Sequence, residues 1–326
     1  MDLPFNELIR GKKLMQNAAN ILIISHKNPD ADTVAANVAM KIALMQIGKN
    51  VRCACADPIP ESYDFLPGYN NFITEINLAD YDLVITVDVG AHYLLKYHET
   101  HPDILDKEKI NLINIDHHPS NDNFGSVNIV VDTAAATCLI LNTLLQELGF
   151  EITRDMATCL LSGIYYDTGS FMHSNTNAEV YEVAGQLMSK GADFKTIVKK
   201  LFHTTPINQM KLWGRILNRA RINKKNVVSS AVTNKDLEEL GLSSKDSSGA
   251  IDYLNAVPDS KFCVLLSEDM QGNVKGSLRT QRDDVDLSEL TASFGGGGHK
   301  KAAGFTMPGE LEQQTVWRIK KNEEVE

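Results

Sequence analysis

Three short apolar runs in the first 120 residues constrain the fold more than any other feature of the chain. Each run is rich in β-branched residues and is followed by aspartate or histidine. The runs and the polar residues after them are 21–24 before Ser25-His26, 83–87 before Asp88, and 112–115 before Asp116-His117-His118. Continuous apolar runs of this length are typical of parallel strands that are buried on both faces. The first half of the chain is therefore predicted to contain a parallel sheet.

Helical segments lie between or after these runs. Val34, Val38, Ile42 and Met45 recur at helical spacing before Gly48, a residue type that commonly ends helices. Strand–helix alternation of this kind predicts an α/β fold with a doubly wound, mainly parallel sheet, in which ligands bind beyond the carboxyl ends of the strands. The polar residues at the three strand ends are therefore expected to form one site. Further helices are predicted at 134–149, 153–166, 177–190 and 194–202.

A second α/β unit begins in the last third of the chain. From His203 to Lys225 we expect a connecting helix, in which Lys211, Arg215 and Arg219 step by four along one face. This basic face either steers anionic substrates or is a solvated linker surface. The sequence thus predicts a first domain at 1–202, a linker helix at 203–225 and a smaller domain with a mixed sheet at 226–326. The features expected in the smaller domain are strands at 226–232, 262–267 and 274–278 and a glycine-rich loop at 295–298.

Composition excludes several classes of protein. Hydrophobic residues make up 43% of the chain and charged residues 23%, which argues against a disordered protein. No apolar run approaches the roughly 20 residues of a membrane-spanning helix, and the first seven residues lack the features of a secretion signal. The five cysteines form no C-x-x-C pair, and their odd number argues against a disulfide framework. We therefore expect a cytoplasmic protein that does not bind membranes.

The net charge limits the kind of anion that the protein binds. The 32 basic and 42 acidic residues give a formal charge of −10. Proteins that hold long nucleic acids usually carry a basic excess. No stable complex with long nucleic acid is therefore expected, and an anionic substrate should be small.

Carboxylates and imidazoles dominate the strand ends. They are His26, Asp30 and Asp32 in the first loop, Asp88, the Asp116-His117-His118 triplet, and Asp167 at a helix end, where Gly163 would allow close approach. A single aspartate before a helix is more often only an N-cap, but burying this many carboxylates without cations would be very costly. Oxygen ligands with some imidazole suit Mn²⁺, and less decisively Fe²⁺, Co²⁺ or Mg²⁺. The number of ligands indicates two ions about 3.5–4 Å apart that share a carboxylate.

These segments resemble the motifs of the DHH phosphoesterase family, a RecJ-like family that is named after the triplet Asp116-His117-His118. The family often has a Gly-Ser pair where this chain has Ala35-Ala36, a difference that removes no metal ligand. The other matching segments are 26–32 for the first motif, Val87-Asp88 for the second, 167–171 for the fourth, and 276–279 with 295–304 for the subfamily-1 associated domain.

The resemblance implies a role for each of these residues. One ion would be held by His26, Asp30 and Asp88, and the other by Asp32, Asp88, His117 and Asp167, so that Asp88 bridges them. His118 would face the substrate phosphate, supported by Asp116. The implied substrate-binding residues of the second domain are Arg279, Gly297, Gly298, His299 and Lys300, although a glycine tract is often only a loop.

The resemblance also implies a reaction. The chain is most similar to the nanoRNase and pAp-phosphatase branch, whose members use two metal ions, here expected to be manganese, and a metal-bridging hydroxide. The expected substrates are short oligonucleotides, dinucleotides and 3′-phosphoadenosine 5′-phosphate (pAp), and a homodimer is compatible with this branch. Alternatives are hydrolysis of cyclic or linear dinucleotides and, with less support, a single-strand exonuclease or a pyrophosphatase. A nucleotide-binding regulatory protein without catalysis is a further alternative, but no metal ligand is missing.

Overall fold

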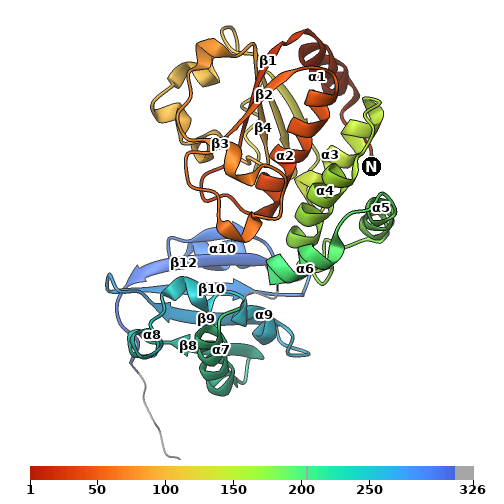
Figure 1. Cartoon of the computed structure of the whole chain (residues 1–326). Coiled ribbons are helices and arrows are strands. Elements are labelled where there is room, and N and C mark those ends of the chain that lie inside the picture. Colours follow the sequence, from red (N-terminus) through yellow and green to blue (C-terminus); the bar gives the residue numbers. More distant parts are fainter. Residues whose placement is uncertain (203–204, 313–326) are drawn as a thin grey trace, which may run out of the picture. The chain divides into compact units, whose positions relative to one another are not determined.

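The computed structural model describes residues 1–202 and 205–312, and it divides the chain into two compact units, Met1–Thr204 and Thr205–Glu326 (Figure 1). The first residues of the predicted linker, 203–204, and the end of the predicted second domain, 313–326, lie outside the described residues. Among the described helices, none is long and apolar enough to cross a membrane.

The first unit contains a six-stranded parallel sheet, which confirms the predicted fold class. The strand order is β3-β2-β1-β4-β5-β6, so the direction of winding reverses between β1 and β4. The three strands predicted from the apolar runs lie side by side at its centre and are almost completely buried. The strands are β1 (Asn20–Ile24), β2 (Asn50–Ala54), β3 (Phe72–Ile73), β4 (Leu83–Val87), β5 (Leu112–Asp116) and β6 (Val127–Val130).

The two faces of this sheet are covered differently. One face packs against α1 (Phe5–Asn17), α2 (Ala31–Gln46) and α3 (Thr137–Glu147). Helix α4 (Arg154–Asp167) packs on α2 and α3, and α5 (Ala178–Ser189) and α6 (Phe194–Phe202) pack on α4. The other face packs against loops and short 3₁₀ helices between β2 and β6, through residues such as Leu95, Tyr97 and Ile104. The segment between β4 and β5 contains no α-helix but three short 3₁₀ helices, at His92–Leu94, Tyr97–Glu99 and Pro102–Leu105.

The predicted helix at 134–149 begins three residues late. Ala136 is extended, with φ −162° and ψ 155°, and α3 starts at Thr137. The reason lies in tertiary structure, because Asp32 accepts hydrogen bonds from the backbone N–H groups of Thr137 and Cys138. A carboxylate from α2 thus caps a helix that begins about a hundred residues later.

The second unit contains a six-stranded mixed sheet in the order β11-β12-β10-β9-β8-β7, in which β8 and β9 are parallel. The prediction of a glycine-rich loop at 295–298 is partly wrong, because Gly297–His299 form the edge strand β11, which pairs with β12. The strands are β7 (Arg221–Ile222), β8 (Val227–Val232), β9 (Phe262–Glu268), β10 (Asn273–Arg279), β11 (Gly297–His299) and β12 (Ala302–Pro308). The helices are α7 (Ile207–Arg219), α8 (Asn234–Leu240), α9 (Ala250–Asn255) and α10 (Leu287–Ala292).

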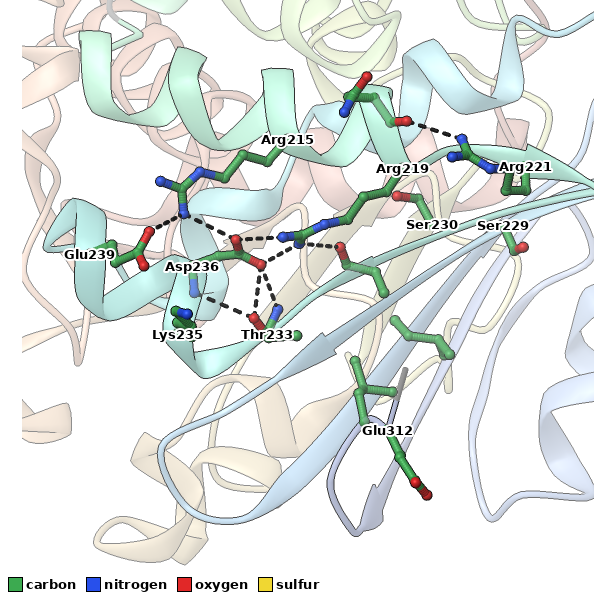
Figure 2. A pocket seen from close by; sticks show the side chains of 14 residues that line it. Arg215, Arg219, Arg221, Ser229, Ser230, Thr233, Lys235, Asp236, Glu239 and Glu312 are labelled. Carbon is green, nitrogen blue, oxygen red and sulfur yellow. Dashed lines mark hydrogen bonds and ion pairs between the residues drawn. The ribbon is translucent and has the colours of Figure 1, made fainter. Parts of the chain in front are cut away.

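The helix α7, which was expected to be a separate linker, belongs to the second unit. Leu212 and Ile216 are completely buried in the core of this unit against β8 and β9. On the basic face of α7, Lys211 is exposed to solvent, whereas Arg215 and Arg219 are partly exposed and bind a carboxylate of the same unit. Asp236, which is 3% exposed, accepts hydrogen bonds from Arg215 and Arg219 and also from the N–H and hydroxyl groups of Thr233 (Figure 2).

Replacing Asp236 by Asn should destabilise the second unit in a pH-dependent way. Burial would raise the pKa of Asp236, but the hydrogen bonds from Arg219 and Thr233 outweigh burial and hold this pKa well below its usual range. A folded-state pKa below the unfolded value contributes stability above about pH 4, and this contribution is lost as the pH falls further. At pH 7, Asp236→Asn should lower the free energy of unfolding by about 1–3 kcal/mol, since both arginines are partly exposed.

Urea unfolding followed by tryptophan fluorescence measures this effect, because both tryptophans of the chain lie beyond residue 204. Glu239→Gln is the matched control, since Glu239 is half-exposed and pairs with Arg215. Equal losses for the two variants, or a loss for Asp236→Asn that does not shrink between pH 4 and pH 2, would contradict this account.

Candidate metal centre

The polar side chains that follow the central strands converge where the winding of the sheet reverses. His26 follows β1, Asp88 follows β4, and Asp116 ends β5. Three groups of side chains have potential ligand atoms that all lie within 4.8 Å of one another. These groups are His26, Asp30 and Asp88; Asp88, His117 and His118; and Asp32, His117 and Asp167. The structure thus brings together all six residues expected as metal ligands.

Asp88 lies between two of the imidazoles. Its Oδ2 is 3.5 Å from Nε2 of His26, and its Oδ1 is 3.6 Å from Nε2 of His117. The residue is 2% exposed, and its φ of 61° lies in the left-handed region, which is uncommon for aspartate and is found at functional sites. The Thr137 hydroxyl donates to Oδ1 over 3.0 Å. Asp88 is therefore held with one oxygen toward each imidazole.

The two imidazoles next to Asp88 have the orientation of metal ligands. Nδ1 of His26 lies 2.7 Å from the carbonyl oxygen of Lys27, and Nδ1 of His117 lies 3.2 Å from that of Ala134. A carbonyl oxygen can only accept, so each Nδ1 carries a proton and donates it, and Nε2 is the ring nitrogen that faces the carboxylates and could bind a metal ion. Metal-bound histidines are usually oriented by a hydrogen bond of this kind.

His118 is held differently. Its backbone N–H and its Nδ1 both bind the buried carboxylate of Asp116, over 3.2 and 2.8 Å. Asn121 donates to the same carboxylate over 2.6 Å. Burial would lower the pKa of His118, but the hydrogen bond with Asp116 outweighs burial and raises it. The Nε2 of His118 is thus the ring nitrogen that Asp116 leaves for another partner.

Two aspartates combine a structural role with a place in the cluster. Asp30 is the N-cap of α2 and accepts hydrogen bonds from the N–H groups of Asp32 and Thr33. The N-cap role that was considered as the alternative to a metal ligand is therefore present in the structure. Its Oδ1 also lies 3.8 Å from Nε2 of His26. Asp32 caps α3 and shares the third ligand group with His117 and Asp167.

Gly163 permits the close approach that the sequence suggested. A Cβ at this position of α4 would lie 2.1 Å from Oδ1 of Asp32 and 2.4 Å from Sγ of Cys138. Any larger residue would therefore displace Asp32 or separate the helices. Asp167 at the end of the same helix lies 3.2 Å from Nε2 of His117.

Sequence reasoning missed the segment 134–138, which supports several of these side chains at once. It provides the carbonyl for His117, the two N–H groups for Asp32 and the Thr137 hydroxyl for Asp88. The side-chain amide of Asn175 donates hydrogen bonds to the carbonyl oxygen of Ala135, which belongs to this segment, and to the carbonyl oxygen of Asp167. Most of these contacts are made by backbone atoms, which every residue type has. The residue types in this segment therefore give little indication that it supports the site.

The electrostatics of the cluster fit bound cations. Burial raises the pKa of Asp167 to about 6, and burial together with the charges of Asp88 and Asp167 raises that of Asp32. Burial would also raise the pKa of Asp88, but the hydrogen bond with His26 and the charge of His117 lower it to about 2. For His26, burial is outweighed by hydrogen bonds with Asp30 and Asp88, and the pKa rises to about 11. The carboxylates therefore require positive charge nearby, which imidazolium or metal ions can supply.

The substrate-binding residues predicted in the second unit form a group of their own. Arg279 on β10 pairs with Ala302 on β12, which in turn pairs with His299 on β11. Residues directly opposite one another in antiparallel strands share a face, so Arg279 and His299 project from the same side of the sheet. Gly298 has a φ of 137°, and a Cβ there would collide with the backbone of Ala302. Lys300 follows in an exposed turn.

The pocket in Figure 2 is a different feature of the second unit. It has a volume of about 880 Å³ and lies along β8, between α7 and α8. The residues lining it include none of the predicted site residues within the described chain. Its Arg215 and Arg219 are already bound by Asp236 and Glu239.

The sequence matches two family models and several curated relatives. Residues 20–164 match the N-terminal domain of the DHH family, and residues 224–321 match the DHHA1 domain. The bifunctional oligoribonuclease and PAP phosphatase NrnA of Thermus thermophilus is 31% identical over 296 residues, which cover 90% of this chain and 86% of the relative. The protein of the same name from Bacillus subtilis is 27% identical and covers 92% of each chain.

Solved structures share the fold. An exopolyphosphatase-related protein from Bacteroides fragilis superposes with a TM-score of 0.84 at 24% identity, over 96% of this chain and 93% of that one. RecJ from Thermus thermophilus in complex with Mn²⁺ superposes with a TM-score of 0.53 at 14% identity, over 94% of this chain and 52% of that one. The motifs, the fold and the relatives agree, and the chain belongs to the DHH family, with a DHHA1 domain after its N-terminal domain.

Proposed function

We propose that this protein is a metal-dependent phosphoesterase that hydrolyses very short oligonucleotides and pAp. The names of the relatives from Thermus thermophilus and Bacillus subtilis support this substrate class. The observation that carries the proposal is the position of Asp88 between two groups of carboxylates and imidazoles. Paired metal sites with a shared carboxylate are typical of phosphoester hydrolysis.

The proposed ligands follow the three groups of side chains. His26, Asp30 and Asp88 would hold one divalent cation, and Asp32, Asp88, His117 and Asp167 the other. Oxygen donors with two imidazoles suit manganese, which we propose as the metal. When bound, the two cations supply the positive charge that activates water and offsets the charge developing on the phosphate.

His118 has a separate role in this proposal. Asp116 fixes its ring through the Nδ1 contact and the backbone contact, so its Nε2 can donate a hydrogen bond to a phosphate oxygen. Its side chain is 33% exposed, which leaves it accessible to substrate. Gly90 leaves room for the ring, because a Cβ there would lie 3.1 Å from Cβ of His118.

The second unit would bind the part of the substrate that is not hydrolysed. Arg279 offers a guanidinium, which can bind a phosphate through two hydrogen bonds. Strand β11 lies at the edge of its sheet, so one side of the Gly297–Gly298 backbone is free of strand pairing. We propose that these groups, with His299 and Lys300, hold a remote phosphate or nucleoside.

A product-resolved panel tests the function. The substrates are dinucleotides, pentanucleotides, a 20-mer, pAp, cyclic di-AMP and pyrophosphate, each with Mn²⁺. We expect turnover of the dinucleotides, the pentanucleotides and pAp. Preferential turnover of cyclic di-AMP would favour the second-messenger alternative, and no turnover at all would favour a nucleotide-binding regulatory protein. The cytoplasmic location and the homodimer stay predictions.

Asp88→Asn should abolish hydrolysis of every substrate and reduce the bound manganese from two ions per chain. The reason is that each proposed site loses a charged oxygen ligand. Elemental analysis of the purified variant counts the metal, and dinucleotide hydrolysis gives the rate. Asp103→Asn, an exposed aspartate that pairs with Lys109, is the control. More than a few percent of wild-type turnover at any manganese concentration would contradict the assignment of Asp88.

Thr137→Val should weaken manganese binding or activity by about tenfold, because the variant keeps the shape of the side chain but removes the hydroxyl that donates to Asp88. Activity measured across a manganese titration detects this change. Thr143→Val on the same helix is the matched control. Identical manganese curves for Thr137→Val and wild type would show that the hydroxyl does not support the metal centre.

Arg279→Ala and His299→Ala should reduce kcat/KM for dinucleotides and pAp by about ten- to a hundredfold, the loss expected for a charge-assisted contact. They should barely affect bis-p-nitrophenyl phosphate, which lacks a remote phosphate. Lys275→Ala, an exposed lysine on the same strand as Arg279, is the control. Equal losses on both kinds of substrate would place these residues in the chemical step instead.

A further inference from the structure

The first unit holds a second histidine in the same way that it holds His118. The backbone N–H and the Nδ1 of His92 both bind one carboxylate oxygen of Asp122, over 3.2 and 2.6 Å. The backbone N–H and the Nδ1 of His118 likewise bind the carboxylate of Asp116, but through its two different oxygens. In both pairs the carboxylate fixes the ring and leaves Nε2 as the nitrogen for another partner. The His92 side chain is 44% exposed.

This second pair is connected to the metal centre through short contacts. The N–H of Asp122 donates to the carbonyl of Gly90 over 3.3 Å, and Gly90 packs against His118. The neighbouring Asn121 donates to the Asp116 carboxylate over 2.6 Å. His92 follows β4, and Asp122 follows β5, at the same edge of the sheet as Asp88. The pair therefore lies on the rim of the proposed active site.

A cation and an exposed aromatic ring lie on the same rim. Tyr93 is 55% exposed, and Nζ of Lys27 lies 5.6 Å above the centre of its ring. The N–H of Lys27, the residue after His26, donates to the carbonyl of Leu94 over 2.8 Å. The loop after β1 and the loop after β4 are therefore joined, and they present an imidazole, an ammonium group and a phenol ring together.

Packing alone does not account for these side chains. Val89, Leu95 and Tyr97 of the segment after β4 are buried in the core that covers this face of the sheet. His92 and Tyr93 leave much of their ring surface exposed, although Asp122 holds His92 in place. An exposed ring beside two positively charged or hydrogen-bonding groups is the combination that binds a nucleobase and its adjoining phosphate.

We propose that His92, Tyr93 and Lys27 form a nucleotide subsite next to the metal centre. Tyr93 stacks on the base of the nucleotide adjoining the scissile phosphate, while His92 and Lys27 donate to the oxygens of its backbone. This inference rests on the proposed function and adds to it a contact to the base within the first unit. It also explains how the first unit can select a nucleotide, since the metal ligands act only on the phosphate.

The test compares a dinucleotide with two analogues, the first without the base at one position and the second without the base at the other. Each substrate is measured with Mn²⁺. Tyr93→Ala should raise KM for the dinucleotide by about tenfold with little change in kcat. It should leave KM unchanged for the analogue that lacks the stacked base. Tyr93→Phe keeps the ring and should behave like wild type. Elemental analysis should find the same manganese content in every variant.

His92→Gln should lower kcat/KM by about tenfold on the dinucleotide and on both analogues, because all three retain the backbone that it contacts. Unchanged KM for Tyr93→Ala on the dinucleotide, or equal losses on both analogues, would overturn the stacking role. Wild-type kinetics for His92→Gln would remove His92 from the subsite. If the wild-type protein hydrolyses the dinucleotide, either failure concerns the subsite alone. If it hydrolyses no nucleotide, the proposed function fails, and the subsite fails with it.

Discussion

The first unit is organised around the cost of burying three carboxylates at one edge of a parallel sheet. Asp32 and Asp88 are almost completely buried, and Asp167 lies beside them. Their mutual repulsion would oppose folding if positive charge were absent. The pKa values of about 11 for His26 and about 10 for His117, where hydrogen bonds and nearby carboxylates outweigh burial, show how strongly the site attracts positive charge. Divalent cations satisfy the same requirement.

Several details of the fold follow from this requirement. Helix α3 begins at Thr137, where its free N–H groups meet Asp32, and Gly163 allows α4 to approach the same carboxylate. Asp88 adopts a left-handed backbone conformation, so that its oxygens face two imidazoles. In the second unit, by contrast, Asp236 is neutralised within the protein by two arginines. A carboxylate that is paired in this way stabilises the unit and is not available for a metal ion.

The two units of the chain would therefore have different tasks. The first unit concentrates negative charge, which suits metal ions and hydrolysis at phosphorus. The second unit presents Arg279 and His299 in one row of its sheet, at whose edge β11 lies. Selectivity for nucleotides requires contacts beyond the phosphate, because metal ions do not distinguish one ester from another. The rim around His92 and Tyr93 and the row around Arg279 are the proposed sources of these contacts.

The sequence by itself determined the parallel sheet, the family and the six side chains that converge at the strand ends. Continuous apolar runs and polar residues directly after them are local signals, and the carboxyl ends of parallel strands necessarily meet at one edge. Only the tertiary structure decided which groups hold these side chains in place. The carbonyl of Ala134, the N–H groups at the start of α3 and the burial of α7 in the second unit depend on contacts between distant segments. Such contacts use backbone atoms or amphipathic faces, which residue spacing does not distinguish from those of an ordinary helix or loop.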